Sequence, residues 1–269
     1  MKKLYAIITA ALLLCGCTEN DNPVTETAVG GSEVVTEKTV ITTAVENTSM
    51  SETTTEEIVE TVTIAGQEFP IDTESVTLYI SDIENITDVS GLGKLYNLRY
   101  LDLVRFTDGN TPYITGFNAL ENCDTITDIS IQVGFENYEE IYILETLPNL
   151  TSLSIAGADA YDFWNFNLNT IEHLSLVGTT DLTKIEHLTN LKSLYIEYSS
   201  STDLTPIEKL ENLESLQIWE SRFADYSSIL ELENLKELYI CSTPMTREMY
   251  DNLVENLPDC KITVVNLEE

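Results

Sequence analysis

Few residues of this 269-residue chain have side chains suited to catalysis, and their spacing does not bring them together. The chain contains two histidines, His173 and His187. A cysteine nucleophile needs such a base within hydrogen-bond reach, and the pair to consider is His173 with Cys241. These residues belong to segments three repeats apart in the pattern described below, so their backbones should be roughly 14 Å apart. No phosphate loop, nucleophile elbow or His-Glu-x-x-His motif occurs, and we therefore expect no enzyme activity.

Aspartates recur along the chain at a fixed spacing, which raises the question of metal binding. Asp181, Asp203 and Asp225 lie 22 residues apart, and each precedes a short apolar pattern. A side-chain oxygen at such a position caps the free N–H groups of a helical turn, and we expect this structural role. Asp108-Gly109-Asn110 has ligand chemistry for calcium but lacks the rest of a calcium loop, so a plain turn is expected. We predict no metal ion and no cofactor.

Three cysteines lie outside the N-terminal segment, at Cys123, Cys241 and Cys260. Their odd number and their spacing argue against both a disulfide framework and a zinc site. Cys123 and Cys260 occupy positions at which other repeats carry leucine, so we expect small buried side chains there. Cys241 falls on the solvent side of its predicted strand.

The element that must position every functional side chain is a repeat that occurs seven times between Asp88 and Ile240. Each copy ends in the pattern Leu-x-x-Leu-x-Leu, with Ile in place of Leu at some positions, and the spacing of the clearest copies lies in the 20–29-residue window of leucine-rich repeats. The last two apolar positions alternate with polar residues, as in a strand with one buried face. The preceding apolar residues lie three apart, as in a 3-10 turn. The pattern predicts an α/β solenoid with a curved parallel sheet on its concave face and short helical or 3-10 turns on its convex face.

The two ends of the repeat array, which occupies residues 88–243, carry different patterns. Residues 61–87 contain two alternating segments with Phe69-Pro70 as a turn or short crossover between them, and they predict an N-terminal cap and the first strand. Residues 244–269 contain a helical pattern with Thr246 as its N-cap, followed by a strand. We expect this helix and strand to form a C-terminal cap over the last apolar face.

The N-terminal residues have the pattern of a secretion signal. Two lysines precede an apolar stretch of 11 residues, Leu4 to Leu14, which is too short to span a bilayer. Gly16 before Cys17 completes a pattern that resembles the lipobox of bacterial lipoproteins, in which cleavage precedes a lipid-bearing cysteine. The resemblance implies a signal peptide at residues 1–16, acylation of Cys17 (palmitate included) and a place in the bacterial cell envelope. The repeat domain would then be exposed outside the cytoplasm; a plain secretory signal is the alternative.

Residues 17–60 differ from the rest in composition. They consist mainly of Thr, Glu, Val, Ser and Asn without an aromatic residue, so they predict a disordered tether, whose glycosylation the composition leaves open. The whole chain carries 46 Asp and Glu against 13 Lys and Arg. This charge repels phosphate backbones and anionic headgroups. We therefore expect no nucleic-acid partner, and we expect the lipid anchor to be the only contact with the membrane.

Over roughly residues 61–269 the chain resembles the leucine-rich repeat domains of bacterial internalin-like surface proteins. The resemblance rests on the period and the apolar positions given above. It implies a protein-binding function and carries no catalytic residue with it. The chain departs from that family three residues after the last apolar strand position, where Thr179, Ser199, Ser221 and Thr243 replace asparagine. Hydroxyl groups can satisfy part of the loop backbone, so we expect a looser turn in the same fold.

The outward-facing strand positions of the last three repeats carry the candidate binding residues. Equivalent positions of earlier repeats hold small residues such as Ser154 and Gly157. Exposed Tyr and Trp are frequent anchors of interfaces; the alternative is that stacked aromatic rings only stabilise neighbouring strands. The predicted partner-binding residues are Tyr195, Glu197, Tyr198, Gln217, Trp219, Glu220 and Tyr239.

Two insertions, at residues 105–113 and 134–138, are further candidates for ligand binding. Both follow a strand, so both should emerge on the same edge of the solenoid. The aromatic segment Tyr161–Phe166 is different, because Phe163 and Phe166 fall on core positions and only Tyr161 and Trp164 face outward. We interpret that segment as core filling.

These observations favour a lipid-anchored cell-surface recognition protein that binds a protein partner, basic or neutral, through its concave sheet. Binding of a glycan or of the cell wall is the first alternative, since exposed Tyr and Trp also suit sugars. A passive envelope scaffold is the second. The sequence leaves open the identity of the partner, the organism and the oligomeric state.

Overall fold

The computed structural model describes residues 36–40, 58–82, 84–106, 110–157 and 168–266. Its described residues form two compact units, a C-terminal unit of residues 127–132 and 148–266 and an N-terminal unit that holds the others. No helix within the described ranges is long and apolar enough to cross a membrane. The signal segment and Cys17 lie outside the described residues, so the lipid anchor stays a prediction.

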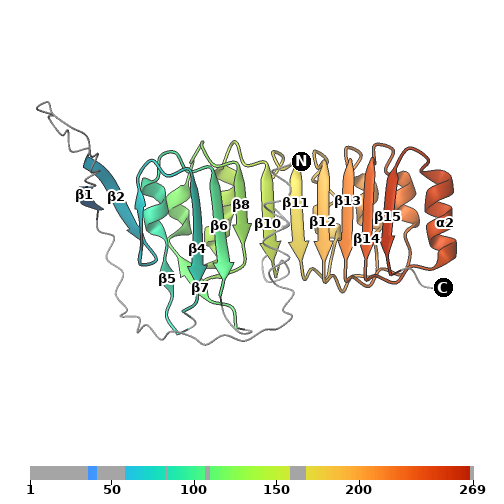
Figure 1. The fold of residues 1–269 in the computed structure, drawn as a ribbon, viewed down its shortest axis with the longest axis horizontal. Helices are drawn as coiled ribbons and strands as arrows, with labels where there is room; N and C mark the ends of the chain where they lie inside the picture. Colours follow the sequence, from blue (N-terminus) through green and yellow to red (C-terminus); the bar gives the residue numbers. More distant parts are fainter. Residues whose placement is uncertain (1–35, 41–57, 83, 107–109, 158–167, 267–269) are drawn as a thin grey trace, which may run out of the picture. The chain divides into compact units, whose positions relative to one another are not determined.

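The C-terminal unit contains the predicted parallel sheet, and each repeat contributes one strand (Figure 1). The sheet follows the order β8-β10-β11-β12-β13-β14-β15. Neighbouring strands pair in parallel, and their bounds are β8 Asp128–Ile131, β10 Ser152–Ala156, β11 His173–Val177, β12 Ser193–Glu197, β13 Ser215–Trp219, β14 Glu237–Cys241 and β15 Lys261–Val265. From β10 to β14 each strand extends one residue beyond the predicted apolar end, because that residue still pairs with the next strand.

One face of this sheet is a set of buried apolar ladders. Leu194, Leu216 and Leu238 lie opposite one another on β12, β13 and β14, and all three side chains are buried. The isoleucines two residues later form a second buried ladder. Because side chains alternate along a strand, the residues between them project from the other side, which we call the open face of the sheet.

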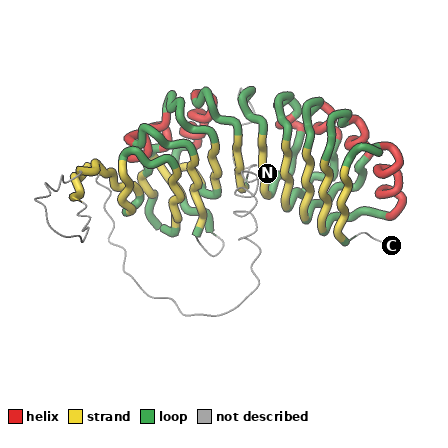
Figure 2. Tube along the Cα trace, turned by 45° about the horizontal axis from the view of Figure 1, so that its top comes forward, coloured by secondary structure: helices red, strands yellow, loops and turns green. Residues whose placement is uncertain are grey.

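The other half of each repeat is a 3-10 turn, as the spacing of three predicts. The turns η6 Thr183–Ile185, η7 Thr205–Lys209 and η8 Ser227–Glu231 lie away from the open face (Figure 2). The predicted capping role of the aspartates is confirmed: Asp181, Asp203 and Asp225 each accept a hydrogen bond of 2.9 Å from the backbone N–H two residues later. These carboxylates satisfy turn donors that lack a backbone partner.

A buried column of hydroxyl groups replaces the asparagines that internalin-like repeats carry. Thr179, Ser199, Ser221 and Thr243 are all buried. Ser199 donates through Oγ to the Thr179 carbonyl at 2.9 Å, and its own N–H donates to Ser221 Oγ at 3.1 Å. The Ser221 N–H donates to Thr243 Oγ1 at 3.4 Å. The hydroxyls therefore satisfy loop backbone between adjacent repeats, as expected from their type.

The C-terminal cap consists of the predicted helix and strand. Helix α2 spans Arg247–Asn256, and the side chain of Thr246 accepts a hydrogen bond from the Met249 N–H at 3.3 Å. Strand β15 follows and pairs with β14. The buried Leu253 is the apolar contact of α2, so this end of the stack is covered.

The N-terminal unit contains the beginning of the array. Strand β4 (Ser75–Ile80) pairs in parallel with β6 (Tyr100–Arg105), and η1 (Ser90–Lys94), η2 (Phe117–Leu120) and η3 (Tyr138–Thr146) are its 3-10 turns. A second small parallel sheet has the order β5-β7-β9, with strands Thr87–Asp88, Tyr113–Thr115 and Gly134–Phe135. The sequence gives no sign of it, because strands of two or three residues leave no periodic pattern.

Three short segments differ from the sequence prediction. Phe69-Pro70 is not a turn but the end of strand β3 (Gln67–Pro70), which pairs antiparallel with β2 (Ile58–Ile64). The turn lies at Ala65-Gly66, whose φ angles of 50° and 76° are those of a tight hairpin. Strand β1 (Thr36–Val40) pairs with β2 and lies inside the predicted tether. Two threonines and one valine among its five residues have the β-branched side chains that suit a strand, even though the segment around it is polar.

Candidate functional site

The predicted binding residues come together on the open face of strands β12, β13 and β14. Tyr195, Gln217 and Tyr239 lie opposite one another across the three strands. Glu197 lies opposite Trp219, which in turn lies opposite Cys241. We call the set Tyr195, Glu197, Tyr198, Gln217, Trp219, Glu220 and Tyr239 the aromatic–acidic patch.

Three aromatic rings of this patch are neighbours, and two of them are stacked. The Trp219 ring lies 4.9 Å from the Tyr239 ring, centroid to centroid, at an interplanar angle of 25°. On its other side the Tyr195 ring is 6.5 Å away and tilted by 38°. Such pairs stabilise the sheet beyond the area that they bury. The three side chains are half-buried, so they are less exposed than their outward strand positions suggest, because the rings cover one another.

Glu197 is the largest departure from the sequence prediction within the patch. Its side chain was expected to be exposed, yet the residue retains only 7% of its accessible surface. Burial raises the pKa of the Glu197 carboxyl, a hydrogen bond with Tyr195 lowers it in part, and the charge of Glu220 raises it. Burial also raises the pKa of the Tyr195 phenol. Glu197 is therefore an internal acid of the patch, and only Glu220 is an exposed one.

Two buried polar atoms of the patch have no hydrogen-bond partner among the residues that the structure describes. These are Oε2 of Glu197 and Nε1 of Trp219. A buried donor or acceptor without a partner costs about 1–3 kcal/mol. One atom is an acceptor and the other a donor, and their residues are directly opposite on β12 and β13. One unmet acceptor and one unmet donor thus lie just beneath the surface of the patch, and a ligand bonds to them only when a covering side chain moves aside.

The residues that directly follow the strands have a left-handed backbone. In the two preceding repeats this position is glycine, with φ of 71° at Gly157 and 77° at Gly178. The patch places side chains there instead, with φ of 52° at Tyr198 and 42° at Glu220. The N–H of each still donates to the neighbouring strand, at 3.2 Å and 3.0 Å. Since this conformation costs an L-residue about 1–2 kcal/mol, the patch holds two side chains where glycine would be less strained.

The catalytic pair considered from the sequence is not assembled. His173 lies at the start of β11 and Cys241 at the end of β14, three strands further in the sheet. The prediction that Cys241 faces solvent is wrong, because the residue is buried on the open face between Trp219 and Val265. Cys123 and Cys260 are half-buried where full burial was expected.

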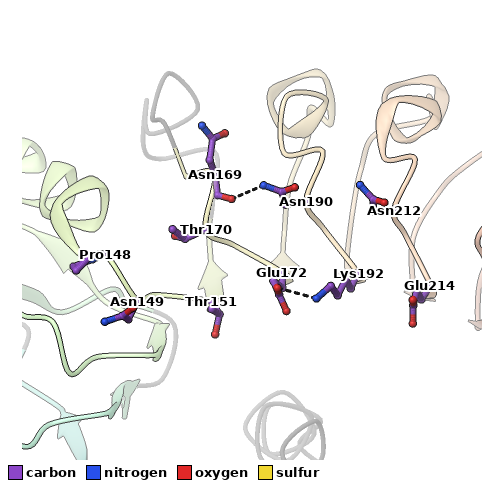
Figure 3. A pocket seen from close by; sticks show the side chains of 10 residues that line it. All are labelled: Pro148, Asn149, Thr151, Asn169, Thr170, Glu172, Asn190, Lys192, Asn212 and Glu214. Carbon is purple, nitrogen blue, oxygen red and sulfur yellow. Dashed lines mark hydrogen bonds and ion pairs between the residues drawn. The ribbon is translucent and has the colours of Figure 1, made fainter.

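A polar cavity of about 500 Å³ lies at the edge of the C-terminal unit where the strands begin (Figure 3). Lys192 crosses it and forms an ion pair of 2.8 Å with Glu172. Asn190 donates through Nδ2 to the Asn169 carbonyl at 2.7 Å, and Asn212 repeats this contact one repeat later, at 2.9 Å to the Thr189 carbonyl. These residues were not predicted as a site, although an Asn-Leu pair precedes strands β10, β12, β13 and β14. The asparagines join neighbouring repeats.

The predicted binding loops of the N-terminal unit are only partly loops. Tyr113 and Gly134 lie opposite each other on β7 and β9, so the two insertions meet side by side as expected. Phe135 is buried against Phe117, with ring centroids 5.1 Å apart, and is no candidate for ligand contact. Tyr138 is exposed, whereas Asp108 and Gly109 lie outside the described residues. So do Tyr161 to Phe166, whose predicted core role is untested.

An exposed aromatic pair in the N-terminal unit was not anticipated. The rings of Tyr79 and Phe106 meet edge to face at 6.3 Å, and the residues keep 59% and 69% of their accessible surface. Tyr79 lies between the buried Leu78 and Ile80 on β4. Its outward position could have been found from the alternation along that strand.

Comparisons with known proteins identify similar solved structures. No protein-family profile and no curated protein matches the chain. Internalin C2 of Listeria monocytogenes is 19% identical over 74% of this chain and 75% of its own, with a TM-score of 0.41. The plant peptide hormone receptor RGFR1, in complex with RGF2, is 14% identical over 74% of this chain and 41% of its own, with a TM-score of 0.41. A leucine-rich repeat protein of Leptospira interrogans is 19% identical over 64% of this chain and 56% of its own, with a TM-score of 0.39.

The fold follows from the chain's own sequence and structure. A repeated Leu-x-x-Leu-x-Ile pattern places one parallel strand and one 3-10 turn in each of the clearest repeats, with the leucines in register. A capping helix and strand follow the last repeat. The chain therefore folds as an α/β leucine-rich repeat solenoid.

Proposed function

We propose that this chain is a lipid-anchored surface protein that binds a protein partner through the aromatic–acidic patch. The observation that carries the proposal is the Trp219 side chain. Its ring is held by Tyr239 at 4.9 Å, while its indole N–H has no partner within the described residues. A partner that supplies the missing acceptor recovers a hydrogen bond at little cost in side-chain entropy, since the ring is already fixed.

The composition of the patch matches that of an interface centre. Tryptophan and tyrosine carry much of the binding energy in protein interfaces and cluster near their centres. Here they lie on three adjacent strands, which hold them more rigidly than loops would. Glu220 is the exposed charge of the patch and suits a steering role toward a cationic partner.

The envelope location is the second part of the proposal. It rests on the lipobox-like Gly16-Cys17 after an apolar stretch, as well as on the acidic composition of the chain. A chain with a net charge of −33 is repelled by anionic lipid headgroups. An acylated Cys17 would hold it at the membrane by its N-terminus, with the repeat domain free to meet a partner.

Photo-crosslinking tests the proposed surface. A benzophenone amino acid replaces Tyr198 in the full-length protein, and a control probe replaces Tyr96, which is more exposed (60% against 40%) and lies in the N-terminal unit. We expect one crosslinked protein from the Tyr198 probe that disappears when Trp219→Ala is added, and no such product from Tyr96. A product that persists in the Trp219→Ala background would contradict binding through the patch.

Glycan binding is the second candidate, and the cavity in Figure 3 favours it. Amide, hydroxyl, carboxylate and ammonium groups line this cavity, and sugars are bound through such groups. A glycan array with the wild-type protein and Lys192→Ala would test it, because Lys192 crosses the cavity. Signal that depends on Lys192 and not on Trp219 would assign the function to this edge instead of the patch.

A further inference from the structure

The two unpartnered atoms of the patch restrict the chemistry of what binds there. Glu197 Oε2 accepts hydrogen bonds and Trp219 Nε1 donates them. The ligand must therefore bring a donor and an acceptor to neighbouring positions, since the two residues are opposite each other on β12 and β13. A peptide meets both requirements, because a side chain can donate to the carboxylate while a backbone carbonyl accepts from the indole.

The charges around Glu197 require the donor to be cationic. The open-face positions of β12, β13 and β14, all described, include no lysine or arginine and carry Glu197 and Glu237. Glu220 follows β13 and acts on Glu197 by its charge. A neutral donor would leave the charge of Glu197 uncompensated, because the residues opposite it are Val177 and Trp219. Glu237, by contrast, lies opposite Lys261 of β15. A cation neutralises Glu197 in a place that water reaches poorly.

The aromatic rings favour a planar cation over a compact one. Tyr195 and Trp219 are 6.5 Å apart and tilted, close to the about 7 Å at which a flat group contacts a ring on each side. A guanidinium stacks on aromatic faces and also donates hydrogen bonds in its own plane. An ammonium group has the charge but no face for stacking.

From these three observations we propose that the patch recognises an arginine side chain of the partner, stacked beside Trp219 and bonded to Glu197, with a partner carbonyl bonded to the Trp219 indole. The inference rests on the proposed function and names the chemistry of its partner. It also gives Glu197 a role beyond packing.

The test uses the indole N–H of Trp219 as a reporter in the full-length protein. The chain contains two tryptophans, Trp164 and Trp219, so a Trp164→Phe variant assigns the two indole NMR signals. The probes are the N-acetyl, N-methylamide derivatives of arginine, lysine and citrulline, and agmatine. Citrulline keeps the planar shape of arginine without its charge, and agmatine keeps the guanidinium without the carbonyl.

We expect the arginine derivative to move the Trp219 signal in a saturable way and to bind about tenfold or more tightly than the citrulline derivative. The lysine derivative should bind more weakly than the arginine derivative. Agmatine lacks the carbonyl, so it should shift the Trp219 indole signal less from its position in the unliganded protein. Glu197→Gln should reduce arginine binding about tenfold. Glu237→Gln should not, because Glu237 lies on the same face but at the start of β14, whereas Glu197 is at the end of β12.

Equal binding of arginine and citrulline, or no response of the Trp219 signal, would overturn the inference. Arginine binding unchanged by Glu197→Gln in a variant with a wild-type melting curve would do the same. These results are independent of the crosslinking experiment, in which Trp219→Ala is expected to abolish the crosslinked product. The proposed function can therefore hold even if the arginine inference fails.

Discussion

Replacing Glu220 with glycine should stabilise the fold even though it removes a side chain. Glu220 is exposed and has a φ of 42°, so its side chain adds little packing while its backbone is strained. The left-handed conformation costs an L-residue about 1–2 kcal/mol. The added freedom of glycine in the unfolded chain costs about 0.5–1 kcal/mol. The difference predicts a net gain of roughly 0.5–1 kcal/mol in the free energy of unfolding.

Urea denaturation followed by far-ultraviolet circular dichroism measures this gain as a higher midpoint at an unchanged slope. The matched control is Glu237→Gly, since Glu237 is also exposed but lies within β14 and has no positive φ. Glycine inside a strand should cost about 0.5–1 kcal/mol. If both variants move the midpoint in the same direction, the argument from backbone strain is refuted.

The same Glu220→Gly variant has a functional consequence. Removal of the exposed carboxylate should slow association with a cationic partner and reduce its dependence on salt. A variant that is more stable but binds more slowly would show that the strain at this position serves recognition. Glu197 does not share this steering role, because it is buried.

Three further predictions concern the core, the internal acid and the anchor. Leu216→Ala should cost about 2–5 kcal/mol in unfolding experiments because it leaves a cavity in a buried ladder, while Ser215→Ala beside it should cost almost nothing; equal effects would mean that the register is wrong. Burial holds the pKa of Glu197 above its ordinary value of 4.5, so ionisation destabilises the fold as pH rises through the folded value. Glu197→Gln should therefore raise the urea midpoint at about pH 7–8 and have no effect below about pH 4. If the gain in urea midpoint instead grows toward low pH, the fold lowers the pKa of Glu197 and the prediction is wrong. Cys17→Ser should abolish lipid labelling and release the protein from membranes, whereas Cys15→Ser should not, and a Cys17 variant that still fractionates with membranes would rule out this anchor.

The apolar spacing was sufficient to predict the sheet register. Leucine or isoleucine at alternate positions of each repeat can be buried only when the strands pair in parallel with equal offsets, which is the arrangement of Leu194, Leu216 and Leu238. The same spacing placed the aspartates before their turns, where they cap N–H groups. Period and residue type decide these features locally.

Other features depend on contacts that a periodic pattern does not contain. Alternation assigns Glu197 and Cys241 to the open face, and they do lie on it, but neighbouring side chains bury them there. The hairpin at Ala65-Gly66 depends on positive φ angles, and Phe69-Pro70 gave a stronger turn signal nearby. The small sheet of β5, β7 and β9 consists of strands too short to show alternation.

The stacking of Trp219 sharpens the choice between the two interpretations of the patch. A ring that only stabilises neighbouring strands and a ring that anchors a partner both lose stability when truncated, since Trp219 contacts Tyr239 at 4.9 Å. They differ in the affinity of each folded molecule for the partner. A stability measurement alone therefore cannot separate them, and both quantities must come from one preparation.

The central claim is tested most directly by measuring partner affinity and melting temperature on the same preparation of Trp219→Ala, with the crosslinked partner as ligand. The account predicts a folded variant with a modestly lower melting temperature and an affinity weaker by about 2 kcal/mol or more, roughly thirtyfold. Trp219→Phe, which keeps a ring but lacks the indole N–H, should fall between it and the wild type. An unchanged affinity per folded Trp219→Ala molecule, with stability alone reduced, would contradict recognition through the aromatic–acidic patch.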